Sequence, residues 1–427
     1  MALAQAIQPS AQEKPVVIGL YGVSSSRKTT LLNQLKRTLK DEDFMFYEGS
    51  QVIDEVTPGG LAQFKGWSRE RQITSRKAAI DSIRTACIQN KKAAIVSGHF
   101  SFFEDDGKVG SPVITRDDLV TYTHILYLNV PTEILIERRA HDSTRDRPSI
   151  STKGLHKWQE MEISQLRPLC LEYGILFMCV ALGPDSQSRV ANLLHEIRLA
   201  TASIWSVPKH KVKGASLEDI FSSKLGYSYA AFCQAGLLYE ESGDDQEFDR
   251  ICSEVVAGVS MYPEFVCLLH RVAEQEHVRA VVITCGIKRV WEKVMEKERL
   301  SGIVKIIGSG RIADGPVITG HVKGELVSYL QSKYHMKVWA FGDSPLGIDM
   351  LKVADRSIVV VGPEATRGRS MGATLVEAIE CGGVRLKQVA LPPTTPMRLD
   401  FKRLPSLDIT GVDFMDFVHF LRRPPFS

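Results

Sequence analysis

The chain has no long apolar run, no long basic run and no closely paired cysteines. Its 427 residues include 53 Lys and Arg against 50 Asp and Glu, a formal net charge of +3, so charge gives no argument for a nucleic-acid partner. No apolar stretch reaches the roughly 18 residues that a membrane span needs. The polar segment 1–14 lacks the apolar core of a signal peptide. We therefore expect neither a nucleic-acid nor a membrane partner.

The eight cysteines are scattered, and none belongs to a C-x-x-C pair. This spacing predicts neither a zinc site nor a disulfide framework, and it fits a reducing cytoplasm best. Hydrophobic residues make up 44% and charged residues 24% of the chain, which is ordinary for a globular protein. A length of 427 residues is too great for one typical core, so two or three domains are expected.

A nearly complete phosphate-binding loop follows the first apolar segment. Residues 22–30 read Gly-Val-Ser-Ser-Ser-Arg-Lys-Thr-Thr, close to the pattern G-x-x-x-x-G-K-[ST], between a predicted strand and an amphipathic helix. Such a loop directs backbone N–H groups and a helix N-terminus toward an anion. Lys28 would bridge the outer phosphates, and Thr29 would bind Mg²⁺. The predicted nucleotide-binding residues are Gly22, Ser24, Ser25, Ser26, Arg27, Lys28, Thr29 and Thr30.

Arg27 stands where the pattern has its second glycine. Glycine there lets the backbone approach the phosphates without a side-chain clash. Arginine could still contact phosphate as a fork of donors, if the backbone tolerates it. We therefore predict weaker nucleotide binding than an intact loop gives, and tighter binding when glycine is restored. The alternative interpretation is an ordinary Ser-rich turn before a helix.

Both halves of the chain alternate predicted strands and helices, which favours an α/β fold with two doubly wound parallel sheets. The first half has predicted strands at 16–20, 93–96, 125–130 and 175–180, and helices at 70–89, 132–140 and 154–172. The second half has predicted strands at 230–232, 280–284, 303–307, 337–341 and 357–361, and helices at 262–275 and 288–298. We predict a disordered tail at 1–14, a P-loop domain at 15–204, a linker at 205–225, a second domain at 226–390 and a Pro-rich tail at 391–427.

Residues 15–182 resemble the nucleotide-kinase-like branch of P-loop proteins, which holds adenylate and gluconate kinases. The matching features are the loop at 22–30, the strand ending at Gly98-His99, and the sequence Arg-Arg-x-x-Asp-x-x-Arg-Asp-Arg-Pro at 138–148. In those kinases an arginine-rich lid neutralises the transferring phosphoryl group. The resemblance implies ATP or another NTP with Mg²⁺. It makes Lys28, Arg138, Arg145 and Arg147 candidate catalytic residues, with Arg139 in the same lid; the alternative is a solvated helix end with local ion pairs.

Two features of this resemblance stay open. Many relatives carry an acidic residue at the end of the second central strand, to hold Mg²⁺ through water, but Ser97 stands here. Glu48 and Asp54 are possible substitutes. His99 could orient or deprotonate an acceptor hydroxyl, or it could pack beside the phenylalanines at 100, 102 and 103.

Residues 226–390 resemble the haloacid-dehalogenase-like phosphatases, nearest their phosphoserine-phosphatase branch. Thr284 resembles the phosphoryl-holding hydroxyl of the second motif, Lys323 the lysine of the third, and Asp343 an Mg²⁺ ligand of the fourth. The first motif, F-D-x-D-G-T-L, is similar to 232–238, where Cys233 and Ala235 replace both aspartates. Gly347 replaces the second acid of the fourth motif, and Asp349 is displaced from it.

These replacements predict an inactive phosphatase-like domain, because an aspartyl-phosphate route needs a carboxylate nucleophile and a compensating Mg²⁺. Cys233 is then a small residue that fills a former site. The sequence favours a cytoplasmic, phosphate-handling protein in which the P-loop domain phosphorylates a small metabolite or nucleotide. The alternatives are a pseudoenzyme that binds nucleotide or a phosphometabolite as a regulator, an interaction scaffold that binds no phosphate, and a phosphatase with an atypical site.

Overall fold

The computed structural model describes residues 14–39, 43–103, 110–141, 150–181, 186–200, 216–222, 225–241, 243–364, 367, 370–400, 402–410 and 412. Two compact units emerge from its contacts. Unit 1 comprises Met1–Ser242 with Arg311–Ala313, and unit 2 comprises Gly243–Gly310 with Asp314–Ser427. This division falls beyond the linker predicted at 205–225, of which only 216–222 and 225 are described.

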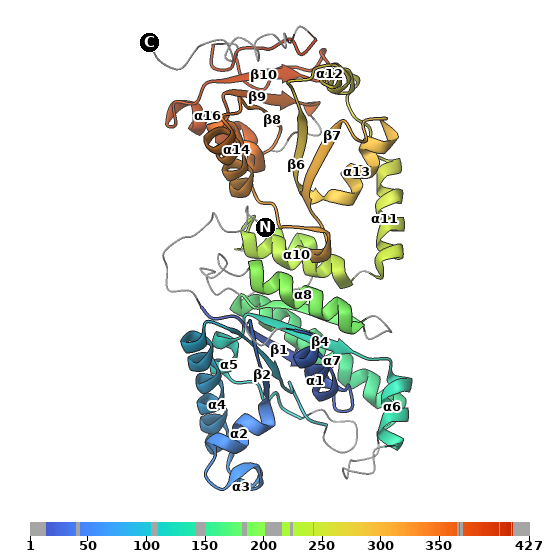
Figure 1. Cartoon of the computed structure of the whole chain (residues 1–427), viewed down its shortest axis with the longest axis vertical. Coiled ribbons are helices and arrows are strands. Elements are labelled where there is room, and N and C mark those ends of the chain that lie inside the picture. Colours follow the sequence, from blue (N-terminus) through green and yellow to red (C-terminus); the bar gives the residue numbers. More distant parts are fainter. Residues whose placement is uncertain are drawn as a thin grey trace. The chain divides into compact units, whose positions relative to one another are not determined.

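Unit 1 alternates strands and helices along its first 181 residues and continues with further helices (Figure 1). Its described elements are β1 (Val17–Tyr21), α1 (Lys28–Thr38), β2 (Phe44–Glu48), α2 (Gly49–Val56), α3 (Gly60–Gly66), α4 (Arg69–Asn90), β3 (Ala93–Ser97), α5 (Arg116–Thr121), β4 (His124–Asn129), α6 (Thr132–Ala140), α7 (Thr152–Tyr173), β5 (Leu176–Ala181), α8 (Ser186–Ala200), α9 (Leu217–Ser222) and α10 (Tyr229–Glu241).

The sheet of unit 1 has five strands in the order β2-β3-β1-β4-β5. All neighbours are parallel, so the C-terminal ends of the strands share one edge of the sheet. Central strand β1 is buried throughout, as an apolar strand covered on both faces should be. The strands predicted at 16–20, 93–96, 125–130 and 175–180, and the helices at 70–89, 132–140 and 154–172, are confirmed as β1, β3, β4, β5, α4, α6 and α7.

Helices cover the sheet of unit 1 as the alternation predicts. The main hydrophobic cluster joins β-strand residues such as Val17 and Ile125 to Ile83 of α4, Leu119 of α5 and Leu166 of α7. Helix α1 contacts β2 and β3 of the sheet and also packs against α8. Helix α7 has sharp limits, because the Ser151 side chain caps its first turn and a left-handed glycine, at φ 68°, follows its last residue.

Helix α10 covers the edge strand β5. Gln234 accepts a hydrogen bond from Phe177 N at 2.9 Å and donates one to Phe177 O at 2.9 Å. Glu241 accepts from Cys179 N at 2.8 Å and from Arg167 Nη2 at 2.5 Å. These side chains satisfy backbone groups that an edge strand would otherwise offer to another strand.

The strand predicted at 230–232 is therefore wrong. Those residues lie in α10, where every position from Ala230 to Leu237 is buried. A short, fully apolar run fits a buried strand and a buried helix equally well by periodicity. Here packing on β5 decides for the helix.

Unit 2 is also built from parallel strands and helices. Its elements are α11 (Asp245–Ala257), α12 (Pro263–Ala273), β6 (Ala280–Ile287), α13 (Lys288–Lys297), β7 (Val304–Ser309), η3 (Ile312–Asp314, whose first two residues count with unit 1), α14 (Gly320–Tyr334), β8 (Trp339–Gly342), η4 (Pro345–Gly347), α15 (Ile348–Val353), β9 (Arg356–Val361), α16 (Met371–Glu380) and β10 (Leu386–Ala390). The strands predicted at 280–284, 303–307, 337–341 and 357–361, and the helices at 262–275 and 288–298, are confirmed as β6, β7, β8, β9, α12 and α13.

Within the described residues the strands of unit 2 form two sheets, one in the order β10-β9-β8 and one made of β6 and β7. All pairs are parallel. The first part of the predicted Pro-rich tail packs on this unit, since Leu404 and Ile409 are buried and Gln388 of β10 donates to Leu404 O at 2.7 Å. Residues 413–427 of that tail lie outside the described part.

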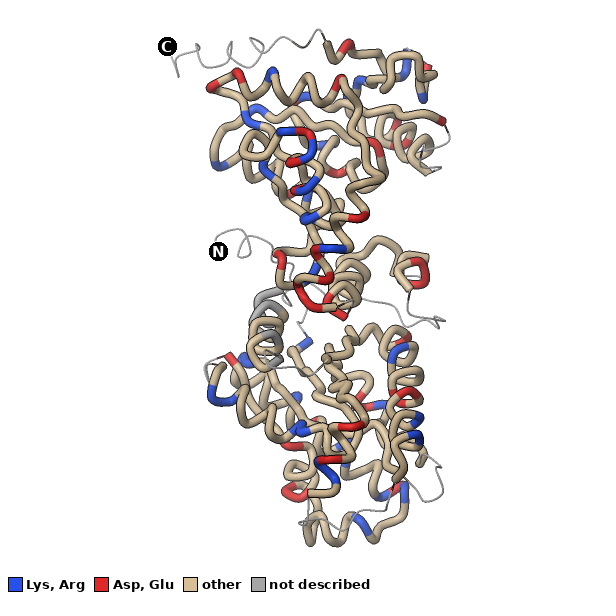
Figure 2. Tube along the Cα trace, turned by 90° about the vertical axis from the view of Figure 1, so that its right-hand side faces the viewer, with Lys and Arg blue, Asp and Glu red and all other residues tan. Residues whose placement is uncertain are grey.

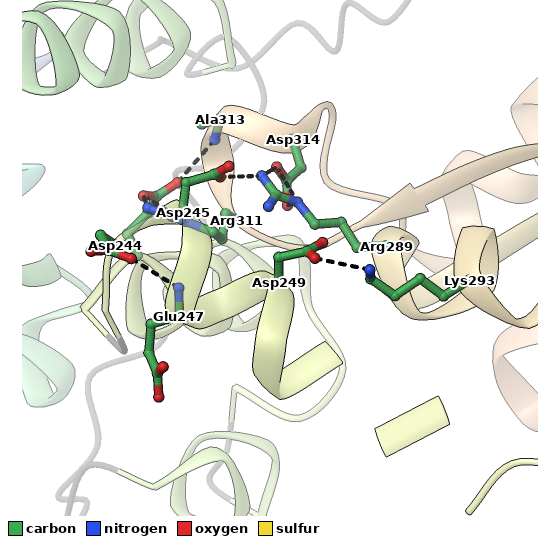
Figure 3. Close-up of polar contacts among 10 residues, drawn as sticks. Asp244, Asp245, Glu247, Asp249, Arg289, Lys293, Arg311, Ala313 and Asp314 are labelled. Carbon is green, nitrogen blue, oxygen red and sulfur yellow. Dashed lines mark hydrogen bonds and ion pairs between the residues drawn. The ribbon is translucent and has the colours of Figure 1, made fainter. Parts of the chain in front are cut away.

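Ion pairs join α13 to α11 and to η3 (Figure 3). Arg289 Nη2 of α13 lies 2.5 Å from carboxylate oxygens of Asp245, on α11, and Asp314, on η3. Lys293 pairs with Asp249 at 2.9 Å. Elsewhere, Figure 2 shows basic and acidic positions interleaved along the trace of each unit, as the near balance of charge leads one to expect. None of the helices in the described ranges has the length and apolarity to cross a membrane.

Candidate functional site

The phosphate-binding loop predicted at 22–30 lies at the C-terminal end of β1, in the middle of the sheet. Gly22 opens it with φ 144°, and a Cβ there would lie 3.0 Å from Leu128 O and 3.0 Å from Ser26 Oγ. Both the backbone angle and the close approach of β4 therefore require glycine. Ligands of open parallel sheets bind at this edge.

The rest of the loop keeps a left-handed turn although its second glycine is missing. Ser25 has φ 72°, and Arg27 has φ 62° and ψ 35° as the N-cap of α1. Non-glycine residues in this conformation carry strain of about 1–2 kcal/mol. The Arg27 side chain makes no cap hydrogen bond, and Arg27 is exposed.

Lys28 occupies the centre of the loop. Its ammonium is buried and donates to Gly22 O at 2.6 Å, to Val23 O at 3.0 Å and to Ser26 Oγ at 3.3 Å. The loop thus already holds a positive charge beside the N-terminus of α1, where an anion is favoured. An incoming phosphate would share Lys28 with these carbonyls.

Thr29 and Glu48 supply oxygen atoms suited to Mg²⁺. The Thr29 hydroxyl donates to Glu48 Oε1 at 3.2 Å. Glu48 is the last residue of β2 and pairs in register with Ser97, the last residue of β3. Glu48 therefore supplies a carboxylate at the ends of the strands, where Ser97 has no charge. Hydroxyl and carboxylate oxygens, completed by phosphate and water, fit the preference of Mg²⁺ for hard ligands. Asp54 instead accepts a hydrogen bond from Leu61 N at 2.5 Å.

The first part of the predicted lid contacts the loop directly. Arg139 Nη1, in the last turn of α6, donates to Ser24 Oγ at 2.8 Å. Arg138 precedes it, and burial lowers its pKa, with the charge of Arg27 adding to the effect. Arg145 and Arg147 lie outside the described residues, so their place in the lid stays a prediction.

His99 follows β3 and packs against Phe102, with ring centroids 5.2 Å apart. This contact matches the packing interpretation. The ring is half-buried, so His99 stays accessible at the end of β3 and remains a candidate site residue.

A buried polar network behind the loop was not predicted from the sequence. Glu162 of α7 accepts hydrogen bonds from Ser101 Oγ at 2.6 Å and Tyr127 OH at 2.8 Å, and Trp158 Nε1 donates to Ser101 Oγ at 2.9 Å. Burial raises the pKa of Glu162, while these hydrogen bonds and the charge of Lys28 oppose the rise. The network ties the segment after β3 to α7. The burial of Glu162 could not be predicted from helical spacing, because a glutamate on a helix is usually exposed.

A pocket of about 810 Å³ opens at the ends of β4 and β5 in the same unit. Its volume lies within the range of small-molecule sites. Gln159 fixes one side, because its Nε2 donates to Val130 O at 3.0 Å. The lining joins the polar residues Asn129, Thr132, Glu133, Thr152, Lys153 and His156 to the apolar residues Val130, Pro131 and Ala181. Sequence reasoning missed this pocket, because its members come from separate elements.

The predicted phosphatase-like site is only partly assembled in unit 2. Lys323 is buried on α14 and interacts with Cys285, whose pKa is raised by burial and lowered in part by that lysine. Thr284 precedes Cys285 on β6, and its hydroxyl oxygen accepts a hydrogen bond from Gly286 N at 2.9 Å. Asp343 follows β8 and lies near Arg398: burial and the charge of Arg367 lower the pKa of Arg398, and Asp343 opposes them in part. Gly347 lies in η4 and Asp349 in α15, where its side chain approaches Gly320.

Cys233 and Ala235 belong to a helix and not to the strand and loop of a first phosphatase motif. Both lie on α10 of unit 1 and are buried. Burial raises the Cys233 pKa to about 12, so its thiol stays protonated. Residues 232–238 form part of a helix, whereas a first phosphatase motif needs a strand and the loop after it. The predicted structure of this segment is therefore wrong.

Among the residues that the structure describes, no group of three or more His, Cys, Asp or Glu side chains is arranged to hold a metal ion. In the part of the chain that the structure describes, Asp343 therefore belongs to no such group. The Thr29–Glu48 pair remains the better candidate for Mg²⁺, because bound phosphate would supply further oxygen ligands there.

Two families match separate parts of the chain. The AAA domain family matches residues 21–156, and the haloacid dehalogenase-like hydrolase family matches residues 194–352. The chain therefore carries a P-loop kinase-like domain followed by a haloacid-dehalogenase-like domain, as the two resemblances predicted. None of the curated proteins matches it.

Similar solved structures include small-molecule kinases. Shikimate kinase from Acinetobacter baumannii in complex with shikimate is 16% identical, with a TM-score of 0.29, over 44% of this chain and 94% of its own. A sugar kinase from Janibacter sp. HTCC2649 is 15% identical, with a TM-score of 0.30, over 44% of this chain and 99% of its own. Shikimate kinase from Bacteroides thetaiotaomicron is 16% identical, with a TM-score of 0.25, over 43% of this chain and 97% of its own. At these values the likenesses carry no argument about substrate.

Proposed function

We propose that the chain is an NTP-dependent kinase for a small metabolite or nucleotide, and that ATP with Mg²⁺ is its phosphoryl donor. The observation that carries the proposal is the contact of Thr29 with Glu48, beside Lys28 at the head of α1. A hydroxyl and a carboxylate are in contact there, and the neighbouring residue supplies a buried ammonium, at the anion-binding end of a helix. When bound, Mg²⁺ would neutralise phosphate charge. Lys28 and the lid arginines would orient the phosphates.

The haloacid-dehalogenase-like domain is proposed to be inert as a phosphatase. Its surviving Lys323 and Thr284 suit a phosphate, but the aspartates of the first motif have no counterpart at Cys233 and Ala235. A phosphorylated small molecule is the ligand that such a residue set would hold. A cytosolic location suits both domains, because all eight cysteines are free thiols.

A pseudoenzyme that binds nucleotide without turnover is the second candidate. The specific observation that favours it is the inward position of Lys28, whose ammonium is already bonded to the loop. Productive transfer would need that ammonium to reach the outer phosphates.

Calorimetric titration of the full chain with Mg²⁺-ATP, followed by measurement of ADP formation with candidate acceptors, tests the proposal. We expect binding that is lost in Lys28→Met. Lys36→Met is the matched control, because Lys36 is an exposed lysine on the same helix. Binding with ADP formation supports the kinase, and binding without ADP formation for any acceptor supports the pseudoenzyme. Absence of binding in the wild type contradicts both.

A further inference from the structure

Arg27 combines an unfavourable backbone conformation with an exposed cationic side chain. Its φ of 62° and ψ of 35° are those that glycine adopts freely. Within the described residues, its guanidinium makes no hydrogen bond or ion pair that would repay this strain in folding. Strained residues of this kind cluster at ligand-binding sites, where the strain is part of the mechanism.

A second guanidinium faces the same region. Arg138 Nη1 is buried and has no hydrogen-bond partner in the described part of the chain. The charge of Arg27 lowers the pKa of Arg138, so the two cations are close enough to repel each other. The hydrogen bond from Arg139 to Ser24, at 2.8 Å, fixes this end of α6 on the loop. Arg138 and Arg27 thus both supply positive charge on the side of the loop that Arg139 contacts.

We propose that Arg27 is a ligand-reading residue which, with Arg138, binds the outermost phosphate of the nucleoside triphosphate. This rests on the proposed function. An arginine fork matches the geometry of phosphate oxygens, and a shared anion removes the repulsion between two guanidiniums. Lys28 then serves the inner part of the loop, where its ammonium already lies. Under this proposal the Arg27 guanidinium contacts the outermost phosphate, a contact that glycine cannot make.

This inference reverses the expectation drawn from the sequence. The sequence predicts that glycine at position 27 tightens binding, because glycine lets the backbone approach the phosphates without a side-chain clash. The left-handed turn at Arg27 shows that the backbone tolerates arginine without losing the loop's conformation. Restoring glycine should therefore relieve strain in the free protein and weaken the complex.

The test measures ATP and ADP affinity, each with Mg²⁺, in the full chain by calorimetry. Arg27→Gly removes both charge and strain, and Arg27→Asn removes the charge with a residue that tolerates the left-handed region. We expect both to weaken ATP binding 10- to 100-fold and to leave ADP binding within about twofold. Arg138→Ala should show the same selective loss. Arg37→Ala, which removes an exposed arginine at the far end of α1, is the control and should change neither affinity.

The outcomes separate this inference from the proposed function. If the wild type binds ATP and Arg27→Gly binds it equally or more tightly, Arg27 is a passive replacement and the inference is wrong, while the proposed function stands. If ATP and ADP affinities fall together, Arg27 contacts an inner phosphate and the assignment to the outermost one is wrong. If the wild type binds neither nucleotide, the proposed function fails and the inference fails with it. A higher urea midpoint for ligand-free Arg27→Gly would confirm the strain independently.

Discussion

Replacing Gln234 by alanine should destabilise unit 1 far more than an average surface substitution does. The Gln234 amide is the partner of both Phe177 N and Phe177 O, and Phe177 is only 1% exposed. Alanine would leave a buried N–H and a buried C=O without partners. Each such group costs about 1–3 kcal/mol, so we expect a loss of about 2–6 kcal/mol in the free energy of unfolding.

Urea denaturation of the full chain, combined with hydrogen exchange of the peptide that contains β5, measures this loss. Hydrogen exchange shows whether the loss of stability is located at β5. This matters because a chain with two units need not unfold in one step. A loss of about 2 kcal/mol or more would speed exchange of the Phe177 amide by about 30-fold or more. Gln187→Ala is the matched control: it removes one exposed hydrogen bond, to Thr38 Oγ1 at 3.1 Å, and should change stability by less than about 0.5 kcal/mol.

Unchanged exchange at β5 in Gln234→Ala would refute the position of α10. Residues 230–232 would then regain their interpretation as a strand, and Cys233 would return as a candidate member of the phosphatase-like site. The experiment thus tests the main difference between the sequence prediction and the structure.

Further predictions concern the sites of both domains. Glu48→Gln should weaken nucleotide binding in the presence of Mg²⁺ but not in its absence, as titrations with and without the metal would show. Arg147→Ala should lower any kinase turnover roughly 10²-fold with little change in stability, and a variant that unfolds would mean a structural ion pair instead. The full chain should release no phosphate from a panel of phosphomonoesters; release that disappears in Cys233→Ser would contradict the inert assignment. Burial raises the pKa of Glu162, so the stability linked to its carboxyl is present below the unfolded pKa and declines as pH rises through the folded one. Glu162→Gln should flatten that decline, so its stability relative to the wild type should grow as pH rises above the pKa of an unfolded glutamate, as urea titrations at several pH values would show.

The sequence predicted the parts of this protein that depend on local signals. The apolar run before Gly22, the loop that follows it and the leucines after Thr29 place a strand, an anion site and a helix in fixed order. Parallel α/β units follow from such alternation, because consecutive strands must be joined by covering helices. For the same reason β6, β7, β8 and β9 lie where their short apolar runs predicted.

Contacts between distant segments were decided only by the tertiary structure. Residues 230–237 are all buried and, apart from Gln234, apolar or small, and only the contact of Gln234 with the backbone of β5 decides that they are a helix. Glu48 and Asp54 were equal candidates until the register of β2 with β3 brought Glu48 to Thr29. The closeness of Arg27 and Arg138 and the burial of Glu162 likewise depend on how α6 and α7 pack on the sheet. Sequence patterns fix the period and order of elements, whereas these pairings join residues whose separation along the chain carries no signal of their distance in space.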